Sequence, residues 1–211
     1  MHLGERECSI QRRHQKVIEE APSPAINNIT RDRIGSIASN AVSEMSYLGL
    51  GTIEFLYEND EFFFIEMNTR LQVEHPITEA ITGIDIVREQ IMIAAGFPLS
   101  FKQSDVKING HAIECRINAE DPKTFVPSPG KITQFHSPSG LGIRVEACVY
   151  SGYVVPPYYD SLIAKVICKG RNRTEAIQRT LRSLDEFVLE GITTTIDLHK
   201  KILKHKSKRN Y

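Results

Sequence analysis

The chain has 211 residues, 41% of them hydrophobic and 25% charged, which is the composition of a globular protein and excludes a disordered tail. Its 26 basic and 26 acidic residues cancel, so no bulk field would hold nucleic acid or an anionic membrane. The four cysteines form no Cys-x-x-Cys pair and no apolar run approaches the roughly 20 residues that cross a bilayer, so we expect reduced thiols, no zinc site and a cytoplasmic protein.

The first half of the chain predicts two helices on either side of a β-hairpin. Apolar residues recur at helical spacing before Gly49, and again before Gly96 with Pro98 just beyond it. Between them, two β-rich runs are separated by three polar residues, and we expect the three consecutive phenylalanines of the second run to pack in the core. The predicted elements are a helix over 30–48, strands over 51–57 and 61–67, a polar loop over 68–78 and a helix over 84–95.

The second half predicts an antiparallel sheet followed by two helices. Its β-type runs are short and are separated by Pro, Gly and Ser turns. The polar stretch 102–109 has no periodicity, so we place a boundary there and expect domains over 1–101 and 108–211, in an α+β fold. The predicted strands cover 111–118, 131–136, 143–149 and 161–168, and the helices cover 177–188, ending at Gly191, and 196–203, capped by residues 193–195.

Two glutamates stand on the two strands of the predicted hairpin. Carboxylates that face each other across a ladder repel unless a cation lies between them, so Glu54 and Glu66, with the amide oxygen of Asn68, could hold Mg²⁺. The competing interpretation is two solvated strand residues. Both carboxylates share a face only if the loop has an odd number of residues or a bulge intervenes, and a three-residue loop over 58–60 fits.

The segment after the hairpin concentrates polar side chains at alternating positions. Arg70, Gln72 and Glu74 would point the same way if the chain is extended there. They offer a guanidinium fork for a carboxylate-like anion, an amide donor and a general base. A solvated polar loop would explain one or two such residues, but not the whole series beside a carboxylate pair.

Four motifs resemble those of the biotin carboxylases, which are ATP-grasp enzymes. NTRLQVEHP at residues 68–76 is similar to the signature loop of biotin-dependent carboxylases, and ERECSIQRRHQK at 5–16 is similar to the signature that precedes it. HAIECRINAEDP at 111–122 and PSPG at 127–130 resemble the opening of the family's C-terminal domain. The resemblance implies the C-terminal lobe of an ATP-grasp domain followed by a biotin carboxylase C-terminal domain, an antiparallel sheet with helices.

The resemblance implies roles for residues on the nucleotide side of the site. Glu54, Glu66 and Asn68 would hold the Mg²⁺ or Mn²⁺ that bridges the ATP phosphates. The side chains expected to line ATP are those of Gln11, His14, Glu54, Leu56 and Glu66.

It also implies roles on the bicarbonate side. Glu74 would deprotonate bicarbonate, which attacks the γ-phosphorus to give carboxyphosphate, and Arg70 would steady the charge on the enolate-like biotin. Arg116 would bind anionic groups beside the biotin ring. The residues expected to hold bicarbonate are Lys16, Arg70, Gln72 and Val73.

Taken singly, several of these residues have plainer interpretations. Arg116 could be an interstrand ion-pair partner of Glu114 or Glu120, and His14 a surface imidazole. No glycine-rich phosphate loop is present, and both ends read as cuts, so we expect half of a site with little activity alone. The alternatives are a truncated or split gene, a fragment that needs a complementing chain, and a non-catalytic assembly module.

The family also implies partners and a setting. They are a biotin carboxyl carrier protein, carboxyltransferase subunits and a second copy in a homodimer, with biotin on the carrier as the acceptor and no nucleic acid or membrane. The setting would be an acetyl-CoA or other acyl-CoA carboxylase of fatty acid synthesis, or the same region of a pyruvate or propionyl-CoA carboxylase.

Overall fold

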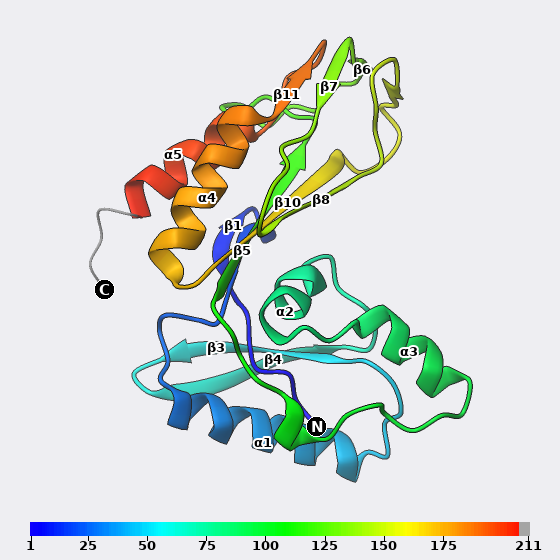
Figure 1. Cartoon of the computed structure of the whole chain (residues 1–211), viewed down its shortest axis with the longest axis vertical. Coiled ribbons are helices and arrows are strands. Elements are labelled where there is room, and N and C mark those ends of the chain that lie inside the picture. The colour runs from blue at the N-terminus through cyan, green and yellow to red at the C-terminus, as the bar shows by residue number, and fades with distance from the viewer. Residues whose placement is uncertain (207–211) are drawn as a thin grey trace.

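A five-stranded antiparallel sheet runs through the middle of the molecule in the order β1-β2-β5-β10-β8. The computed structural model describes residues 1–206, and Figure 1 shows β1 and β5 at the junction between a lower and an upper part. Strands from both halves of the sequence therefore share one sheet. They are β1 (Glu7–Arg12), β2 (Gln15–Ala21), β5 (His111–Asn118), β10 (Leu162–Gly170) and β8 (Ile143–Ala147).

Strands β1 and β2 were not expected from the sequence pattern. Strand β2 buries Ile18, Glu19 and Glu20 in succession, because both faces of the sheet are covered there, and so it lacks the alternation of a half-exposed strand. Arg13 and His14 form the tight turn between the two strands and both have positive φ.

The apolar face of the sheet carries the larger core. Helices α4 (Arg173–Glu186) and α5 (Ile196–Lys206) lie over it, and Leu184 and Leu203 reach the fully buried Ile117 and Val166. Each such buried aliphatic side chain stabilises the fold by about 1.5–3 kcal/mol. The predicted helix over 177–188 is wrong at its end, since Val188 begins the short strand β11 (Val188–Glu190).

Helix α2 (His75–Thr82) covers the opposite, more polar face. Ile77 and Ile81 are buried there with Ala112 and Ile167 of the sheet. The loop predicted over 68–78 is therefore wrong from His75 onward. Proline near the helix start, at position 76, and a left-handed Gly83 at its end delimit eight residues, which are too few to display a period.

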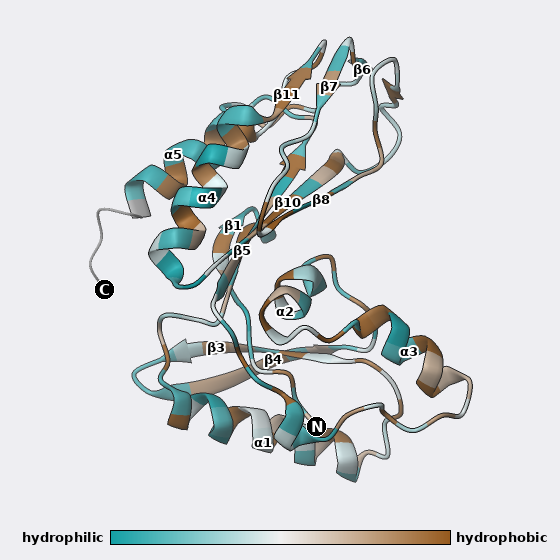
Figure 2. Cartoon of the chain, in the orientation of Figure 1, coloured by the Kyte–Doolittle hydropathy of each residue, from teal (hydrophilic) through white to brown (hydrophobic). Residues whose placement is uncertain are grey.

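The remaining elements of the first half are those that periodicity predicted, with shifted ends. The second predicted helix is α3 (Ile86–Ala94), which begins after the Asp85 N-cap. The first is α1 (Asn28–Glu44), whose Arg31 is its one buried side chain while Ile37 is 55% exposed. A groove of roughly 1280 Å³ separates α1 from the hairpin and the N-terminal segment, and Figure 2 marks apolar residues along α1 in brown.

The hairpin is formed by β3 (Thr52–Glu58) and β4 (Glu61–Asn68). The expected three-residue loop is wrong: Glu58 pairs with Glu61, and Asn59 and Asp60 form a two-residue turn with positive φ. A bulge at Ile65 restores the register, so that Glu54 and Glu66 are direct partners. Phe63 and Phe64 are 50% and 65% exposed, which corrects their expected place in the core.

Short strand pairs and a 3₁₀ turn complete the fold. None of the helices in residues 1–206 is both long and apolar enough to cross a membrane. The four cysteines are free thiols, as predicted. The remaining elements are η1 (Gln103–Asp105), β6 (Gly130–Lys131), β7 (Gln134–His136) and β9 (Val154–Val155), with β6 paired to β9 and β7 to β11.

Candidate active site

Lys16 on β2 joins the hairpin to the segment that follows it. Its Nζ donates to Glu54 Oε1 at 2.7 Å and to Glu74 Oε1 at 2.8 Å. Glu74 is 2% exposed at the start of α2, and Lys16 is 15% exposed. Residues far apart in the sequence thus share one ammonium group at the edge of the groove.

A second cation holds the other oxygen of Glu74. Arg116 on β5 donates from Nη2 to Glu74 Oε2 at 3.0 Å and from Nε to Glu19 Oε1 at 2.6 Å. The interstrand pairing of Arg116 with Glu114 or Glu120 is therefore wrong, and Glu120 pairs with Arg12 at 3.0 Å instead.

Lys16 and Arg6 determine the charge state of Glu74. Burial alone would raise the pKa of its carboxyl, but the hydrogen bond from Lys16 and the charges of Arg6 and Lys16 outweigh burial and lower the pKa. Glu74 is therefore a carboxylate at neutral pH with both oxygens already bonded. An anion that drew Lys16 or Arg116 away would raise its basicity.

Two further carboxyls lie buried behind Arg116. Glu19 and Glu114 are direct cross-strand partners, and both are fully buried. Burial raises the pKa of Glu19 to about 7, and burial together with the charge of Glu19 raises that of Glu114 well above its usual value. Ionising both carboxyls would place two negative charges side by side in the buried sheet at a high free-energy cost, so the pair retains a proton in neutral solution.

The hairpin carboxylates have a donor set suited to a divalent cation. Asn68 Nδ2 lies 3.1 Å from Glu54 Oε1 and 2.9 Å from Glu66 Oε1, so one amide bridges both groups. The hydrogen bonds that reach Glu54 within residues 1–206 all end on Oε1. Oε2 of Glu54 and a rotated Asn68 amide are thus available as oxygen ligands for Mg²⁺.

Gln72 binds the carboxylate of Glu54. Its Nε2 donates to Glu54 Oε1 at 2.9 Å, while its Oε1 accepts from Arg6 Nη2 at 2.6 Å. Arg6 also donates to Thr78 on α2 at 3.1 Å and to Thr52 on β3 at 3.2 Å. Arg6 therefore ties the N-terminal segment to the hairpin and α2.

The other predicted site residues make no side-chain hydrogen bond to Glu54, Glu66 or Glu74 within residues 1–206. Arg70 is exposed and donates to the neighbouring Leu71 carbonyl at 3.2 Å, and Gln11 Nε2 donates to Cys8 O at 3.0 Å. His14 occupies the β1–β2 turn, and Leu56 is 63% exposed on β3. Val73 presents its carbonyl to Lys165 of β10 at 3.0 Å.

Three residues of this network were absent from the sequence-based site: Arg6, Glu19 and Lys165. Arg6 lies within the polar run at residues 5–16 and Glu19 lies three residues beyond it, and that placement was an available signal. Lys165 gave none, because it lies in an ordinary β-type run and only sheet pairing brings it beside Val73. The assembled cluster combines a facing carboxylate pair on the hairpin with the buried carboxylate of Glu74 held between two cations.

Two known sequence families match the chain, one in each part. The family described as "Carbamoyl-phosphate synthase L chain, ATP binding domain" matches residues 1–102. The family described as "Biotin carboxylase C-terminal domain" matches residues 114–211.

Several similar proteins are about twice as long as this chain. A biotin carboxylase of Haemophilus influenzae is 61% identical over 97% of this chain and 46% of its own length. The biotin carboxylase domain dimer of a Hydrogenobacter thermophilus 2-oxoglutarate carboxylase, solved with MgADP, ADP and bicarbonate, has a TM-score of 0.95, 50% identity and coverage of 97% and 46%. The biotin carboxylase subunit of a pyruvate carboxylase has a TM-score of 0.96, 51% identity and coverage of 98% and 46%. The chain therefore spans about half the length of these relatives.

Proposed function

The chain belongs to the biotin carboxylase family, matching its C-terminal half, and we propose that it supplies the metal, bicarbonate and biotin side of an ATP-dependent biotin-carboxylating ligase. The observation that carries this proposal is the Lys16–Glu74–Arg116 cluster beside the Glu54–Glu66 pair. The same proposal keeps 1–101 as the ATP-grasp part and 108–211 as the C-terminal domain, with β1 and β2 of the first part completing the sheet of the second.

Glu54, Glu66 and Asn68 would hold Mg²⁺ or Mn²⁺ in this proposal. The bound ion would neutralise charge on the nucleotide phosphates. Leu56 lies on the same β3 face as Glu54, two residues on, and its exposed side chain suits contact with a nucleotide, while Gln11 and His14 lie exposed at the β1–β2 end.

Lys16, Arg70, Gln72 and the Val73 backbone would hold bicarbonate next to Glu74. An incoming anion competes with Glu74 for Lys16, which frees one carboxylate oxygen and raises its affinity for a proton. Glu74 would then take the bicarbonate proton at that oxygen while Arg116 keeps the other in place. The exposed Arg70 is free to swing toward an anion, which suits its proposed role near biotin.

Arg116 would meet biotin from the sheet side. Its guanidinium is held by Glu19, a fully buried carboxyl, so its fork is fixed in direction before a ligand arrives. The biotin is proposed to arrive on a biotin carboxyl carrier protein in the cytoplasm, with carboxyltransferase subunits as further partners. The proposed reaction ends at biotin carboxylation and names no final carboxyl acceptor. The relatives above include parts of pyruvate and 2-oxoglutarate carboxylases, whose acceptors differ.

A homodimer is the proposed assembly. Leu141 is 88% exposed in the turn before β8, so its apolar side chain is available for contact with a second copy. A second candidate function is a non-catalytic assembly module. It is favoured by the exposed apolar side chains of Ile29 and Ile37 on α1 and Met45 at its end, which a partner could cover.

Calorimetric titration of the chain with Mg·ATP and with bicarbonate tests the proposal. We expect binding of both, loss of Mg·ATP binding in Glu66→Ala, and weakened bicarbonate binding in Arg70→Ala. Both residues are exposed, so these variants should fold normally. If wild type and variants are folded and none binds either ligand, the proposed half-site is wrong and the assembly module stands.

A further inference from the structure

Lys165 lies beneath the loop that leads into Glu74, on the sheet face that α2 covers. Its side chain is 12% exposed, and Nζ donates to the Val73 carbonyl at 3.0 Å and pairs with Glu146 Oε2 of β8 at 2.5 Å. The Val73 carbonyl belongs to the peptide that joins Val73 to Glu74. A largely buried ammonium group therefore binds the main-chain oxygen directly before the proposed base, as well as the carboxylate of Glu146.

Both ends of Glu74 are consequently held by the sheet. Arg116 on β5 binds its carboxylate, and Lys165 on β10 binds its peptide. Arg116 and Lys165 are direct cross-strand partners, so their like charges would repel each other without acceptors. The structure provides acceptors on different sides, Glu19 and Glu74 for Arg116, and Glu146 and the Val73 carbonyl for Lys165.

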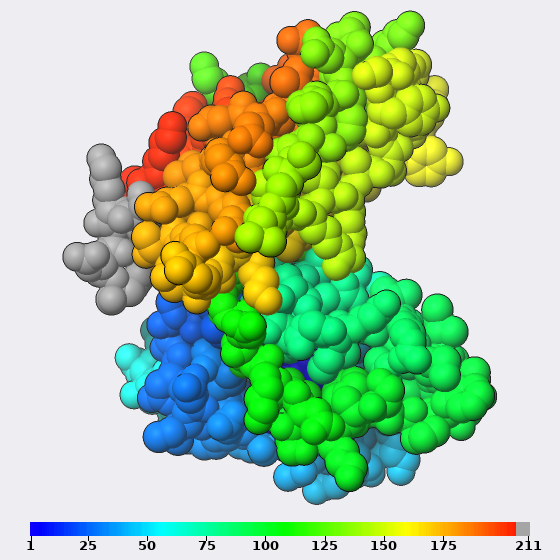
Figure 3. All heavy atoms as spheres, viewed as in Figure 1, coloured from blue at the N-terminus to red at the C-terminus, as the bar shows by residue number. Residues whose placement is uncertain are grey.

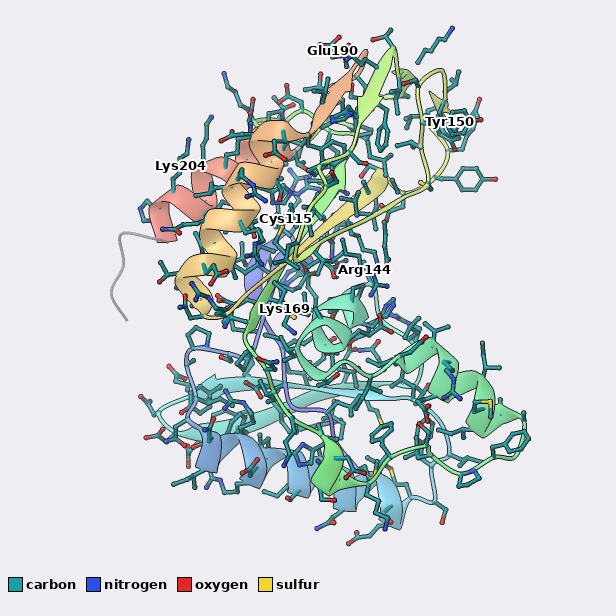
Figure 4. The ribbon with its side chains drawn as sticks, viewed as in Figure 1. Cys115, Arg144, Tyr150, Lys169, Glu190 and Lys204 are labelled. Atoms are coloured by element: carbon teal, nitrogen blue, oxygen red, sulfur yellow. The ribbon has the colours of Figure 1, made fainter. Side chains whose placement is uncertain are left out.

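The same contacts extend from Lys165 to the far side of α2. Glu146 also pairs with Arg144, and Arg144 Nη1 donates to Glu79 Oε2 of α2 at 2.6 Å. Glu79 Oε1 in turn accepts from the Ile86 amide at 3.0 Å. Figure 4 shows Arg144 next to α2, at the junction between the two parts that Figure 3 shows in space-filling form. Glu146 thus links the loop before α2 to the middle of that helix.

We propose that Lys165 is a positioning residue for Glu74, which fixes the Val73–Glu74 peptide so that the carboxylate meets bicarbonate in a reactive orientation. This inference rests on the proposed role of Glu74 as the base. Lys165 itself touches no substrate, and its effect passes through the main chain. A charged donor on a carbonyl makes a stronger hydrogen bond than a neutral one, which suits a loop that must keep its geometry while Lys16 is drawn away.

Lys165→Met tests the proposal because it keeps the aliphatic stem and removes the ammonium group. Lys169→Met is the matched control, since Lys169 lies on the same strand and face and has no hydrogen bond to the loop within the described residues. We would measure the Val73 carbonyl ¹³C shift and the Glu74 amide order parameter by NMR, and bicarbonate affinity by calorimetry. Lys165→Arg should restore part of each change.

In Lys165→Met we expect the Val73 carbonyl resonance to move, the Glu74 order parameter to fall from about 0.85 toward 0.6, and bicarbonate to bind about tenfold more weakly. Lys169→Met should leave all three as in wild type. If Lys165→Met does not fold, Lys165→Gln, which is shorter and uncharged, takes its place with the same readouts.

Unchanged NMR signals in a folded Lys165 variant would overturn the proposal, and so would unchanged bicarbonate affinity where wild type binds. If wild type binds no bicarbonate, the proposed function fails instead. Movement of the Val73 and Glu74 signals would then still support the positioning of that peptide by Lys165.

Discussion

At the scale of single residues, Glu74 is the anion on which two cations converge. Lys16 and Arg116 each hold one of its oxygens in a nearly buried setting. Buried ion pairs add little net stability, but removing one partner leaves charges without compensation. The cluster is therefore costly to disturb even before any ligand binds.

Glu74→Gln should lower the free energy of unfolding by roughly 3 kcal/mol, because Lys16 and Arg116 would lose their shared carboxylate. Urea denaturation followed by circular dichroism measures the change. Glu61→Gln on the exposed side of the hairpin is the control and should stay within about 0.5 kcal/mol of wild type. Equal stability of Glu74→Gln and wild type would mean that the two cations are solvated rather than paired.

The Glu19–Glu114 pair predicts a stability that falls as pH rises. Folding raises the pKa of Glu19 from 4.5 to about 7 and that of Glu114 well above 4.5, so the folded state binds more protons than the unfolded state in this window. The contribution of this pair to the free energy of unfolding should therefore decrease between pH 4.5 and about 7.

Glu114→Gln keeps the shape of the side chain and removes one ionisation, so its stability should depend less on pH over that range. Urea titrations at several pH values measure the slope, with the exposed Glu58→Gln as control. A slope unchanged by Glu114→Gln would show that another group causes the dependence.

At the scale of elements, a side-chain hydrogen bond joins α5 to β5, the strand that carries Arg116. His199 is fully buried, and its Nε2 lies 2.6 Å from the Arg116 carbonyl, to which the neutral ring donates. Burial lowers the pKa of His199 to about 4, despite the opposing effect of this hydrogen bond. The position of Arg116 thus depends in part on a helix remote from the site in sequence.

His199 should make the protein less stable as pH falls from 6.5 toward 4. The unfolded chain binds a proton on this ring in that window and the folded chain does not, so up to about 3 kcal/mol is lost. His199→Gln, which can still donate to the Arg116 carbonyl, should flatten the acid limb of the stability curve. Thermal unfolding between pH 4 and 7 measures it, and an acid limb as steep as that of wild type would contradict the role of His199.

At the scale of the whole molecule, the apolar core is unevenly distributed. The sheet, α2, α4 and α5 bury most of the apolar side chains, whereas Ile34, Ala38 and Val42 of α1 line a wide groove and Ile37 of α1 is exposed.

The same substitution in two helices tests this distribution. Ile77→Ala on α2 should cost about 2–5 kcal/mol, because Ile77 is 0% exposed, whereas Ile37→Ala on α1 should cost less than about 0.5 kcal/mol. Both are measured by denaturation at low protein concentration. A large loss of unfolding free energy in Ile37→Ala would mean that self-association covers Ile37, and a series of protein concentrations would reveal it.

Much of the local structure followed from the sequence alone, because it depends on contacts within a few residues. Helical spacing predicted α1, α3, α4 and α5, and β-rich runs predicted the hairpin and the strands β5 and β10. The motifs identified the family, which the comparisons confirmed. The facing of Glu54 and Glu66 was predicted, with a bulge as one of two routes, and the bulge is the route taken.

Only the tertiary structure decided how the site is held together. Strand β2 is covered on both faces and carries adjacent buried glutamates, so no periodicity marked it as a strand, and its partner β1 contains no buried residue. Arg116 pairs with Glu19 and Glu74 instead of its sequence neighbours, and Lys165 binds the Val73 carbonyl. Sheet pairing makes these contacts, because it brings together residues that are far apart along the chain and leave no local pattern. The sequence thus determined which chemical groups this protein carries, while the packing of the sheet against α2 determined which of them meet.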